Sequence, residues 1–162
     1  MDFSVRTATE SDLPLVFQFI RDLADYEGLL DQVTATEEIL RQSLFVERQA
    51  EVAIGSVEGK DVCFALYFHN FSTFTGCHGL YLEDFYVRPE WRSKGIGRKM
   101  FSYLARLATE RGCLRFEWWC LDSHKKTIEF YTKMGARPMS DWTVYRLDGE
   151  GLKDLSRQAS SL

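Results

Sequence analysis

The sequence lacks any apolar run long enough to span a membrane, and no charged-then-apolar leader opens it. We therefore expect a cytoplasmic location. A basic surface is also missing, since 24 acidic residues outnumber 20 lysines and arginines and the net charge is −4, which argues against nucleic acid as the main partner. No repeat and no low-complexity linker divides the chain, so we expect a single domain over residues 1–162.

Cysteine and histidine are sparse and lack the spacing of a metal site. The four cysteines form no C-x-x-C pair, and we interpret them as reduced, mostly buried thiols. The three histidines are scattered, and we predict no metal. Cys77 and His78 are adjacent in a predicted loop, but two neighbouring residues are weak evidence for a ligand set.

Hydrophobic periodicity predicts an α/β chain in the order β-α-α-β-β-β-α-β-α-β. A strand over 3–8 is followed by a helix capped by Ser11 and ended by Gly28, and a capping box over 34–37 opens a second helix. The later predicted elements are a hairpin of 51–57 and 61–71, a loop over 72–79, strands over 80–87, 114–120 and 142–147, helices over 98–111 and 125–134, and a short helix from Leu152 before a serine-rich tail that frays.

The most informative stretch runs from Val87 to Gly97, between a predicted strand and a predicted helix. Glycines there permit a tight turn and a close approach of the backbone to a ligand. The first turn of a helix presents free N–H groups and the positive end of the helix dipole, and Arg92 and Lys94 add cationic donors. These features predict a phosphate or pyrophosphate site. The Walker pattern is absent, and the spacing is R-x-x-G-x-G instead of the dinucleotide G-x-G-x-x-G.

That loop, in its strand–turn–helix context, resembles the acetyl-CoA loop of the GNAT N-acetyltransferase superfamily. Three further runs resemble its spermidine/spermine (diamine) acetyltransferase branch, so the resemblance covers nearly the whole chain: Leu23-Ala24-Asp25-Tyr26-Glu27, Tyr81-Leu82-Glu83-Asp84-Phe85-Tyr86-Val87 and Phe130-Tyr131-x-x-x-Gly135-Ala136. The resemblance implies a GNAT fold, with a central mixed, twisted sheet flanked by helices, and a homodimer.

The resemblance also implies a binding site for acetyl-CoA. Backbone groups of Phe85, Tyr86 and Val87 would hydrogen-bond the pantetheine arm, which would lie beside the strand like an added strand. The pyrophosphate would be held by Arg92 and by the following residues Ser93, Lys94, Gly95, Ile96, Gly97 and Arg98. His124 occupies a place where the family often has a cofactor-binding asparagine.

Catalytic and substrate roles follow from the same resemblance. Glu83, with Asp84 beside it, would sit near the amine and accept its proton directly or through a water. Tyr131 would contact the cofactor near the thioester sulfur and protonate the departing thiolate, while Tyr26 and Glu27 would line the far end of the amine site. Each residue also has a plain structural interpretation: an ion pair for Glu83, a core aromatic for Tyr131, and a solvated helix end for Tyr26 and Glu27.

We therefore predict an N-acetyltransferase that moves an acetyl group from acetyl-CoA to a primary amine of a small molecule by direct attack in a ternary complex. Diamines or polyamines come first as acceptors and lysine analogues second. The segment between Gly135 and Trp142 lacks the Glu-Glu-Gly of polyamine enzymes, and Asp141 is the candidate to replace its acidic group. Two alternatives stay open: an acetyltransferase acting on protein lysines or N-termini, and a non-catalytic acyl-CoA-binding protein.

Overall fold

The computed structural model describes residues 2–159, which fall into two compact units, Met1–Leu121 and Asp122–Leu162. The serine-rich tail predicted to fray lies largely at positions 160–162, outside the described residues.

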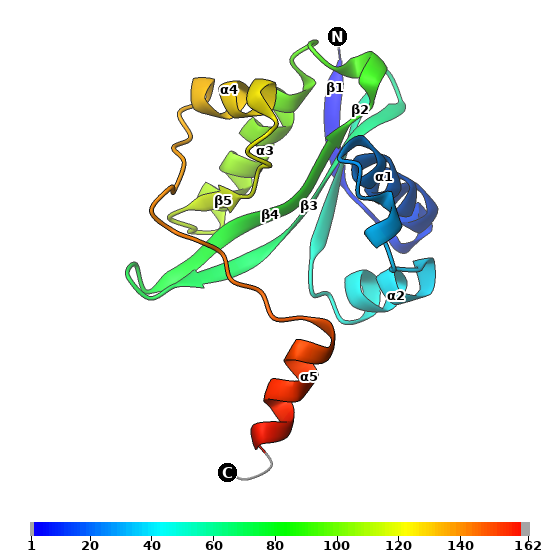
Figure 1. The fold of residues 1–162 in the computed structure, drawn as a ribbon. Helices are drawn as coiled ribbons and strands as arrows, with labels where there is room; N and C mark the ends of the chain where they lie inside the picture. Colours follow the sequence, from blue (N-terminus) through cyan, green and yellow to red (C-terminus); the bar gives the residue numbers. More distant parts are fainter. Residues whose placement is uncertain (1, 160–162) are drawn as a thin grey trace. The chain divides into compact units, whose positions relative to one another are not determined.

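The first unit is built on a five-stranded sheet in the order β1-β2-β3-β4-β5 (Figure 1). Neighbours are antiparallel from β1 to β4, whereas β5 runs parallel to β4, so the predicted mixed sheet is confirmed. The strands are β1 Phe3–Thr7, β2 Glu51–Val57, β3 Lys60–Ser72, β4 Cys77–Val87 and β5 Phe116–Trp118.

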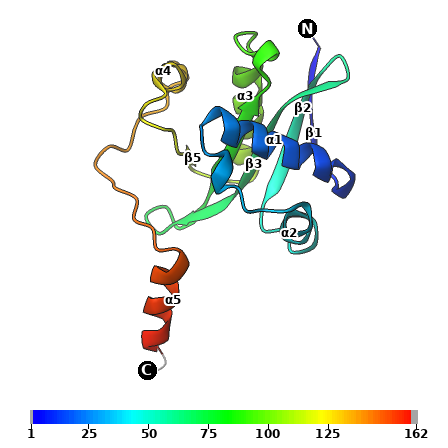
Figure 2. The same cartoon turned by 45° about the vertical axis from the view of Figure 1, so that its right-hand side comes forward.

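Helices cover both faces of this sheet, with α1 and α3 on opposite sides (Figure 2). The helices are α1 Leu13–Tyr26, α2 Glu37–Arg41, which continues into a π-helical turn over Gln42–Val46, and α3 Ile96–Glu110. Short 3-10 turns occupy Glu10–Asp12, Leu30–Gln32 and Pro89–Trp91. This arrangement provides two apolar interfaces, as expected when each amphipathic helix buries one stripe against a sheet.

Alternation along the strands divides the core between the two faces. On one side Val16, Phe19 and Leu44 pack against strand residues, and the Phe19 ring stacks on Phe64 with 5.1 Å between centroids. On the other side Phe101 of α3 contacts Phe85, with ring centroids 5.1 Å apart, and also Phe116 and Trp118. The helix that a β4 side chain contacts therefore shows on which face of the sheet that side chain lies.

Several predicted boundaries need correction. The loop between β3 and β4 is shorter than predicted, because both strands extend toward the turn and leave only 73–76 between them. Conversely, β5 has only three residues of the predicted 114–120, because its pairing with β4 ends early. Helix α3 begins at Ile96, two residues before the prediction, because Gly95 with φ 80° already forms its N-cap.

The residues that cap the first two helices also differ from the predicted ones. Thr9 and Asp12, and not Ser11, form the capping box that precedes α1. Likewise Thr36, and not Thr34, caps α2 by accepting a 3.3 Å hydrogen bond from the Ile39 N–H. In both places neighbouring hydroxyls have similar capping propensity, and the path of the chain decides between them.

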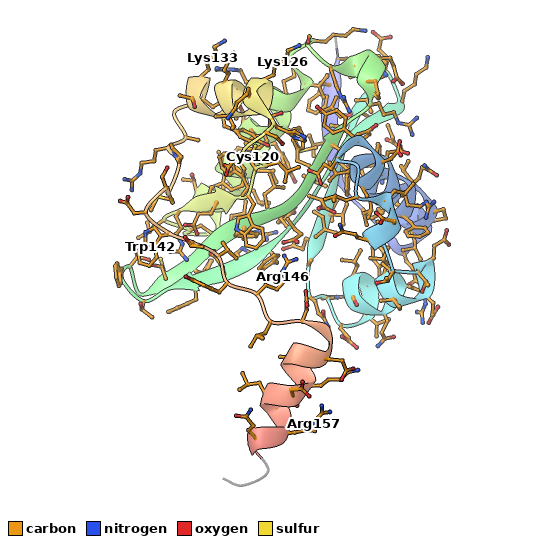
Figure 3. All side chains as sticks on the ribbon, in the orientation of Figure 1. Cys120, Lys126, Lys133, Trp142, Arg146 and Arg157 are labelled. Carbon is orange, nitrogen blue, oxygen red and sulfur yellow. The ribbon has the colours of Figure 1, made fainter. Side chains whose placement is uncertain are left out.

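The second unit contains helices α4 Lys125–Lys133 and α5 Gly149–Gln158. The strand predicted over 142–147 is not formed: within the described residues this segment has no ladder partner and adopts irregular structure. Its apolar side chains are largely exposed, among them Trp142 at 73% and Tyr145 at 91%, and Trp142 and Arg146 project from it in Figure 3. Alternating apolar residues predict a strand only where a neighbouring edge is present to pair with it. No described helix is long and apolar enough to cross a membrane.

Candidate active site

A β-bulge places Glu83 outside the regular pairing of β4. Leu66 of β3 lies opposite Asp84 and the next residue, Tyr67, lies opposite Leu82, so β4 has one residue more than β3 at this point. The extra residue is Glu83, which is exposed. A bulge re-aims side chains, because it shifts the alternation of faces by one residue. Consequently Asp84 lies on the α1 side of the sheet, opposite Leu66 of the α1-facing core.

Beyond this bulge, β4 is paired on one side only. Strand β5 pairs with β4 over Leu80–Leu82, and in the described part of the chain no strand continues along the same edge. The Arg88 N–H donates to the Val62 carbonyl at 2.9 Å, which makes Val87 and Cys63 a non-hydrogen-bonded pair. The backbone groups of Val87, and by alternation those of Phe85, therefore point to the open edge.

This geometry sharpens the prediction for the pantetheine arm. An extended amide-containing chain can pair with the edge at Phe85 and Val87, as a peptide strand would. In the same register the backbone of Tyr86 is turned toward Phe64 of β3, so its N–H and C=O form hydrogen bonds within the sheet. Its ring lies in the buried core on the α1 side, with the Arg92 guanidinium 5.2 Å from the ring centroid, so a hydrogen bond from Tyr86 to the arm stays a prediction.

The loop after β4 forms a concave turn of backbone that ends in a helix N-terminus. Two residues adopt left-handed conformations, Ser93 with φ 59° and Gly95 with φ 80°. Gly95 is the N-cap of α3 and, as a glycine, has no side chain that could accept from the first-turn N–H groups of this helix. Such a turn followed by an uncapped helix start fits a phosphate or pyrophosphate group. Lys94 lies 5.0 Å above the ring of Trp91 at the same place.

Arg92 links this loop to the end of α1. Its Nε donates to the Val87 carbonyl at 2.9 Å, and its guanidinium lies 4.2 Å from the centroid of the Tyr26 ring. Two predicted residues that are far apart in sequence, Tyr26 and Arg92, are thus brought into contact. The contact places the end of α1 beside the start of the phosphate loop.

Three carboxyl groups gather on the α1 side of the sheet near the bulge. Burial, followed by the negative charges of Glu83 and Glu27, raises the pKa of Asp84 to about 6. Charges that repel one another in this way form a natural site for a cation. A carboxyl with a pKa near 6 is also suited to accept a proton at neutral pH, so Asp84 joins Glu83 as a candidate base.

An aromatic group that sequence reasoning overlooked borders these carboxylates. Burial, followed by the charges of Glu83 and Glu117, raises the pKa of Tyr81 to about 12. The Tyr81 ring packs against Phe68 at 5.1 Å and meets the half-exposed Trp119 edge-on at 6.4 Å. The signal in the sequence was the pair of acidic residues that directly follows the apolar run containing Tyr81.

The remaining predicted residues, His124 and Tyr131, lie in the second unit. His124 is the N-cap of α4, and its carbonyl accepts hydrogen bonds from the N–H groups of Thr127 and Ile128. Tyr131 lies within α4, its ring 5.5 Å from that of Phe130. Their roles stay predictions, because each unit is defined by itself.

Comparison with known proteins now identifies the family. The sequence profile of the Acetyltransferase (GNAT) family matches residues 17–136. The chain belongs to this family. It is also 37% identical to the thialysine N-epsilon-acetyltransferase of Sus scrofa, with 94% of this chain and 96% of that protein covered.

Two further comparisons agree with this assignment. The chain is 29% identical to the spermidine/spermine N(1)-acetyltransferase-like protein 1 of Homo sapiens, over 95% of this chain and 24% of that protein. An integron cassette protein from the mobile metagenome of V. cholerae has the same fold, with a TM-score of 0.80 and 26% identity over 97% of this chain and 99% of that one.

The GNAT fold, the likeness to the diamine branch and the enzyme class predicted from the sequence are therefore confirmed. The protein is an acyl-CoA-dependent N-acetyltransferase, and enzymes of this family generally use acetyl-CoA as co-substrate.

Proposed function

We propose that this enzyme transfers an acetyl group from acetyl-CoA to the side-chain amine of a small amino acid of the lysine type, such as thialysine. The observation that carries the proposal is the bulge at Glu83, which sets carboxylates beside the open edge of β4. The name of the Sus scrofa relative supports the acceptor class. The family match spans the boundary between the two units, which supports one acetyltransferase domain over residues 1–162.

The cofactor would lie along the open edge and the phosphate loop. Phe85 and Val87 would pair with the pantetheine arm, and the loop from Arg92 to Arg98 would hold the pyrophosphate. His124 is proposed as a further cofactor-binding residue. Edge N–H groups that are not used by the arm would stabilise the oxyanion of the tetrahedral intermediate. Acetyl-CoA itself supplies the activated acetyl group.

The amine would enter on the α1 side, among the carboxylates of Glu27, Glu83 and Asp84. An alkylammonium with a pKa near 10 is neutral only about one part in a thousand at pH 7, so the proton must be removed before attack. Glu83, assisted by Asp84, would accept this proton directly or through a water. Tyr26 and Tyr81 would present ring faces to the cation before it is deprotonated.

On collapse of the intermediate, the CoA thiolate leaves and needs a proton. A phenol is a neutral donor at pH 7, and Tyr131 is proposed for this step. We expect Tyr131→Phe to lower kcat about tenfold or more and to leave the Kd of acetyl-CoA nearly unchanged. Stopped-flow turnover and calorimetric binding of acetyl-CoA measure the two quantities, and full activity in this variant would remove Tyr131 as the acid.

Arg88 favours an amino-acid acceptor over a simple diamine. Its guanidinium lies 5.2 Å over the Phe19 ring, on the α1 side, and its buried Nε has no hydrogen-bond acceptor among the described residues. A buried donor without an acceptor is unusual, and the carboxylate of a lysine-like substrate could satisfy it. A diamine carries no group of this kind.

The test is CoA thiol release from acetyl-CoA with thialysine, lysine, putrescine, spermidine and a lysine-containing peptide. We expect the largest kcat/KM with thialysine or lysine, and Arg88→Met should raise the KM for these two amino acids while leaving that for putrescine unchanged. Preference for putrescine or spermidine would overturn the amino-acid assignment and support a diamine enzyme. Turnover of the peptide alone would point to a protein acetyltransferase, and no thiol release despite acetyl-CoA binding would point to a cofactor-binding protein.

A homodimer is part of the proposal. Trp142, Val144, Tyr145 and Leu147 are each more than half exposed, which leaves apolar area for a second copy to cover. Sedimentation velocity should give twice the mass of the chain, whereas a monomer at micromolar concentration would contradict the assignment.

We also propose a cytoplasmic location, which the four free cysteines support because free thiols persist in a reducing compartment. Fractionation of cells that express the full chain tests it.

A further inference from the structure

A second cluster of chemically active side chains lies at the other end of β4. His69, His78 and Cys113 offer one ligand atom each, and these atoms lie within 4.8 Å of one another. The two imidazole rings meet edge-on, with centroids 5.0 Å apart. All three residues belong to the first unit.

The fold brings these residues together from two separate elements. Strands β3 and β4 extend past the end of β2, whose pairing with β3 stops at Tyr67, and this ribbon carries both histidines. Helix α3 ends at Gly112, with φ 75°, where the Gly112 N–H bonds to the Thr109 carbonyl and the Cys113 N–H bonds to the Ala108 carbonyl. These two hydrogen bonds form a Schellman motif, which fixes Cys113 just beyond the end of the helix.

A backbone carbonyl sets the protonation of one imidazole. The His78 Nε2 lies 3.0 Å from the Arg111 carbonyl oxygen, which can only accept, so Nε2 carries the proton. The Nδ1 of His78 then has a lone pair for a metal. Metal-bound histidines commonly donate their second ring N–H to a carbonyl in this way.

From this geometry we propose that His69, His78 and Cys113 bind a zinc ion, with a water as fourth ligand. Two imidazoles and one thiolate suit Zn²⁺, which takes nitrogen at about 2.0–2.1 Å and sulfur at about 2.3 Å in a tetrahedron. Ligand atoms in such a site lie roughly 3.3–3.8 Å apart, so a contraction of about 1 Å completes it. On binding, the Cys113 thiol loses its proton to solvent as the zinc–sulfur bond forms.

The surrounding charges are compatible with a cation. Arg111 lies beside the cluster, but its guanidinium forms two hydrogen bonds to the Glu51 carboxylate, which offsets its charge. The Arg115 guanidinium, near the same end of β4, is paired with the Glu117 carboxylate.

The proposed site is separate from the acetyl-transfer site. Glu83 lies five positions after His78 on β4, which corresponds to roughly 16 Å of extended chain. A zinc ion there would join the β3–β4 ribbon to the turn between α3 and β5. We therefore expect zinc to raise Tm and to leave kcat unchanged.

The experiment uses the full chain, without an affinity tag, in a reductant that does not bind metals. Calorimetric titration with Zn²⁺ should give one site per chain, and titration with Co²⁺ should give the thiolate-to-cobalt charge-transfer absorption. A hundredfold excess of zinc over Kd should raise Tm by about 5–10 °C.

Three variants and a control make the assignment specific. Cys113→Ser, His69→Ala and His78→Ala should each weaken zinc binding at least tenfold and abolish the rise in Tm. Cys120→Ser, at a cysteine that follows β5 and is not part of the cluster (Figure 3), should bind zinc as the unchanged protein does. Circular dichroism and retained acetyltransferase activity establish that each variant is folded. Equal zinc affinity in all variants, or no saturable binding at about 100 μM zinc, would overturn the proposal.

Discussion

The two ends of β4 differ in how the strand is partnered. Its first half has β3 on one side and β5 on the other, and the Asn70 side chain of β3 donates to the Glu117 carboxylate of β5. Its second half has a bulge, one open edge and a carboxyl group with a raised pKa. One strand thus combines a saturated half, whose backbone is paired on both sides, with a reactive half, whose backbone has one open edge that is ready to bind a ligand. Function is concentrated where backbone and charge are left unsatisfied.

The largest expected effect at the reactive half comes from Glu83→Gln. The amide keeps the size of the side chain but cannot accept a proton, so kcat at pH 7 should fall about 100-fold or more. The deficit should shrink at high pH, where more of the amine is neutral. Steady-state pH profiles measure this, with Glu110→Gln on the exposed face of α3 as a matched control, and an unaltered profile would argue against a base role for Glu83.

Asp84→Asn should raise the stability of the protein at pH 7 and lower its activity. Because burial raises its pKa from 3.8 to about 6, the folded protein binds this proton more tightly than the unfolded chain does. Stability should therefore fall as pH rises from about 4 to 6, and the destabilisation is fully present at pH 7. The asparagine variant should gain about 1–2 kcal/mol at pH 7, after a discount for solvent screening, and lose about tenfold in kcat.

Urea unfolding at pH 4 and pH 7 tests that prediction. The gain in the free energy of unfolding should be present at pH 7 and absent at pH 4. An equal difference in stability between the variant and the unchanged protein at both pH values would contradict the raised pKa of Asp84, and full activity in the variant would mean that Asp84 does not share the proton of the substrate.

At the saturated half, Gly79→Ala should affect stability and not chemistry. An added Cβ would lie 2.6 Å from the Asn70 Oδ1 and 2.8 Å from the Arg115 Cγ, so both side chains would have to move. Because Arg115 is paired with Glu117 at 2.9 Å, we expect a loss of about 1–3 kcal/mol. Denaturant titration measures the loss, and kcat at saturation should be unchanged.

The smallest effect is expected at Gly95→Ala, in the phosphate loop. An alanine there meets no other atom within 4 Å but must keep φ near 80°, which costs about 1 kcal/mol. Gly59→Ala in the β2–β3 turn carries the same strain, with φ 77° and open space, and is the control. Both variants should lose similar stability, while only Gly95→Ala should raise the KM for acetyl-CoA, by about 3–10-fold. An unchanged KM would argue against this loop as the pyrophosphate site.

Much of the first unit could be predicted from the sequence because its signals are local. The glycines at 95 and 112 indicate the two ends of α3, and the Glu58-Gly59 turn indicates the β2–β3 hairpin, so these elements were predicted within two residues. The bulge could not be predicted, because it is a property of the register between β3 and β4 and not of either sequence alone. The contact of Arg92 with Tyr26 likewise depends on tertiary packing.

The predicted strand over 142–147 was wrong for the same reason. Its apolar alternation is a local signal, but a strand also requires a partner edge, and none of the described residues provides it. The grouping of His69, His78 and Cys113 could not be predicted, because these residues have no regular spacing along the chain and only the strand register and a helix end bring them together.

The bulge also bears on how this sequence can change over time. Because β4 has one residue more than β3 between Leu82 and Phe85, the two residues lie on the same α3-facing side although they are three positions apart. Loss of any single residue there would restore a regular ladder in which Leu82 and Phe85 still face α3, so the sheet would remain but the bulge, with its extra exposed residue, would be lost. The length of this stretch, and not only the identity of its residues, is therefore required for the reactive geometry. The turn at 73–76, which has no such register to keep, is free to grow or shrink.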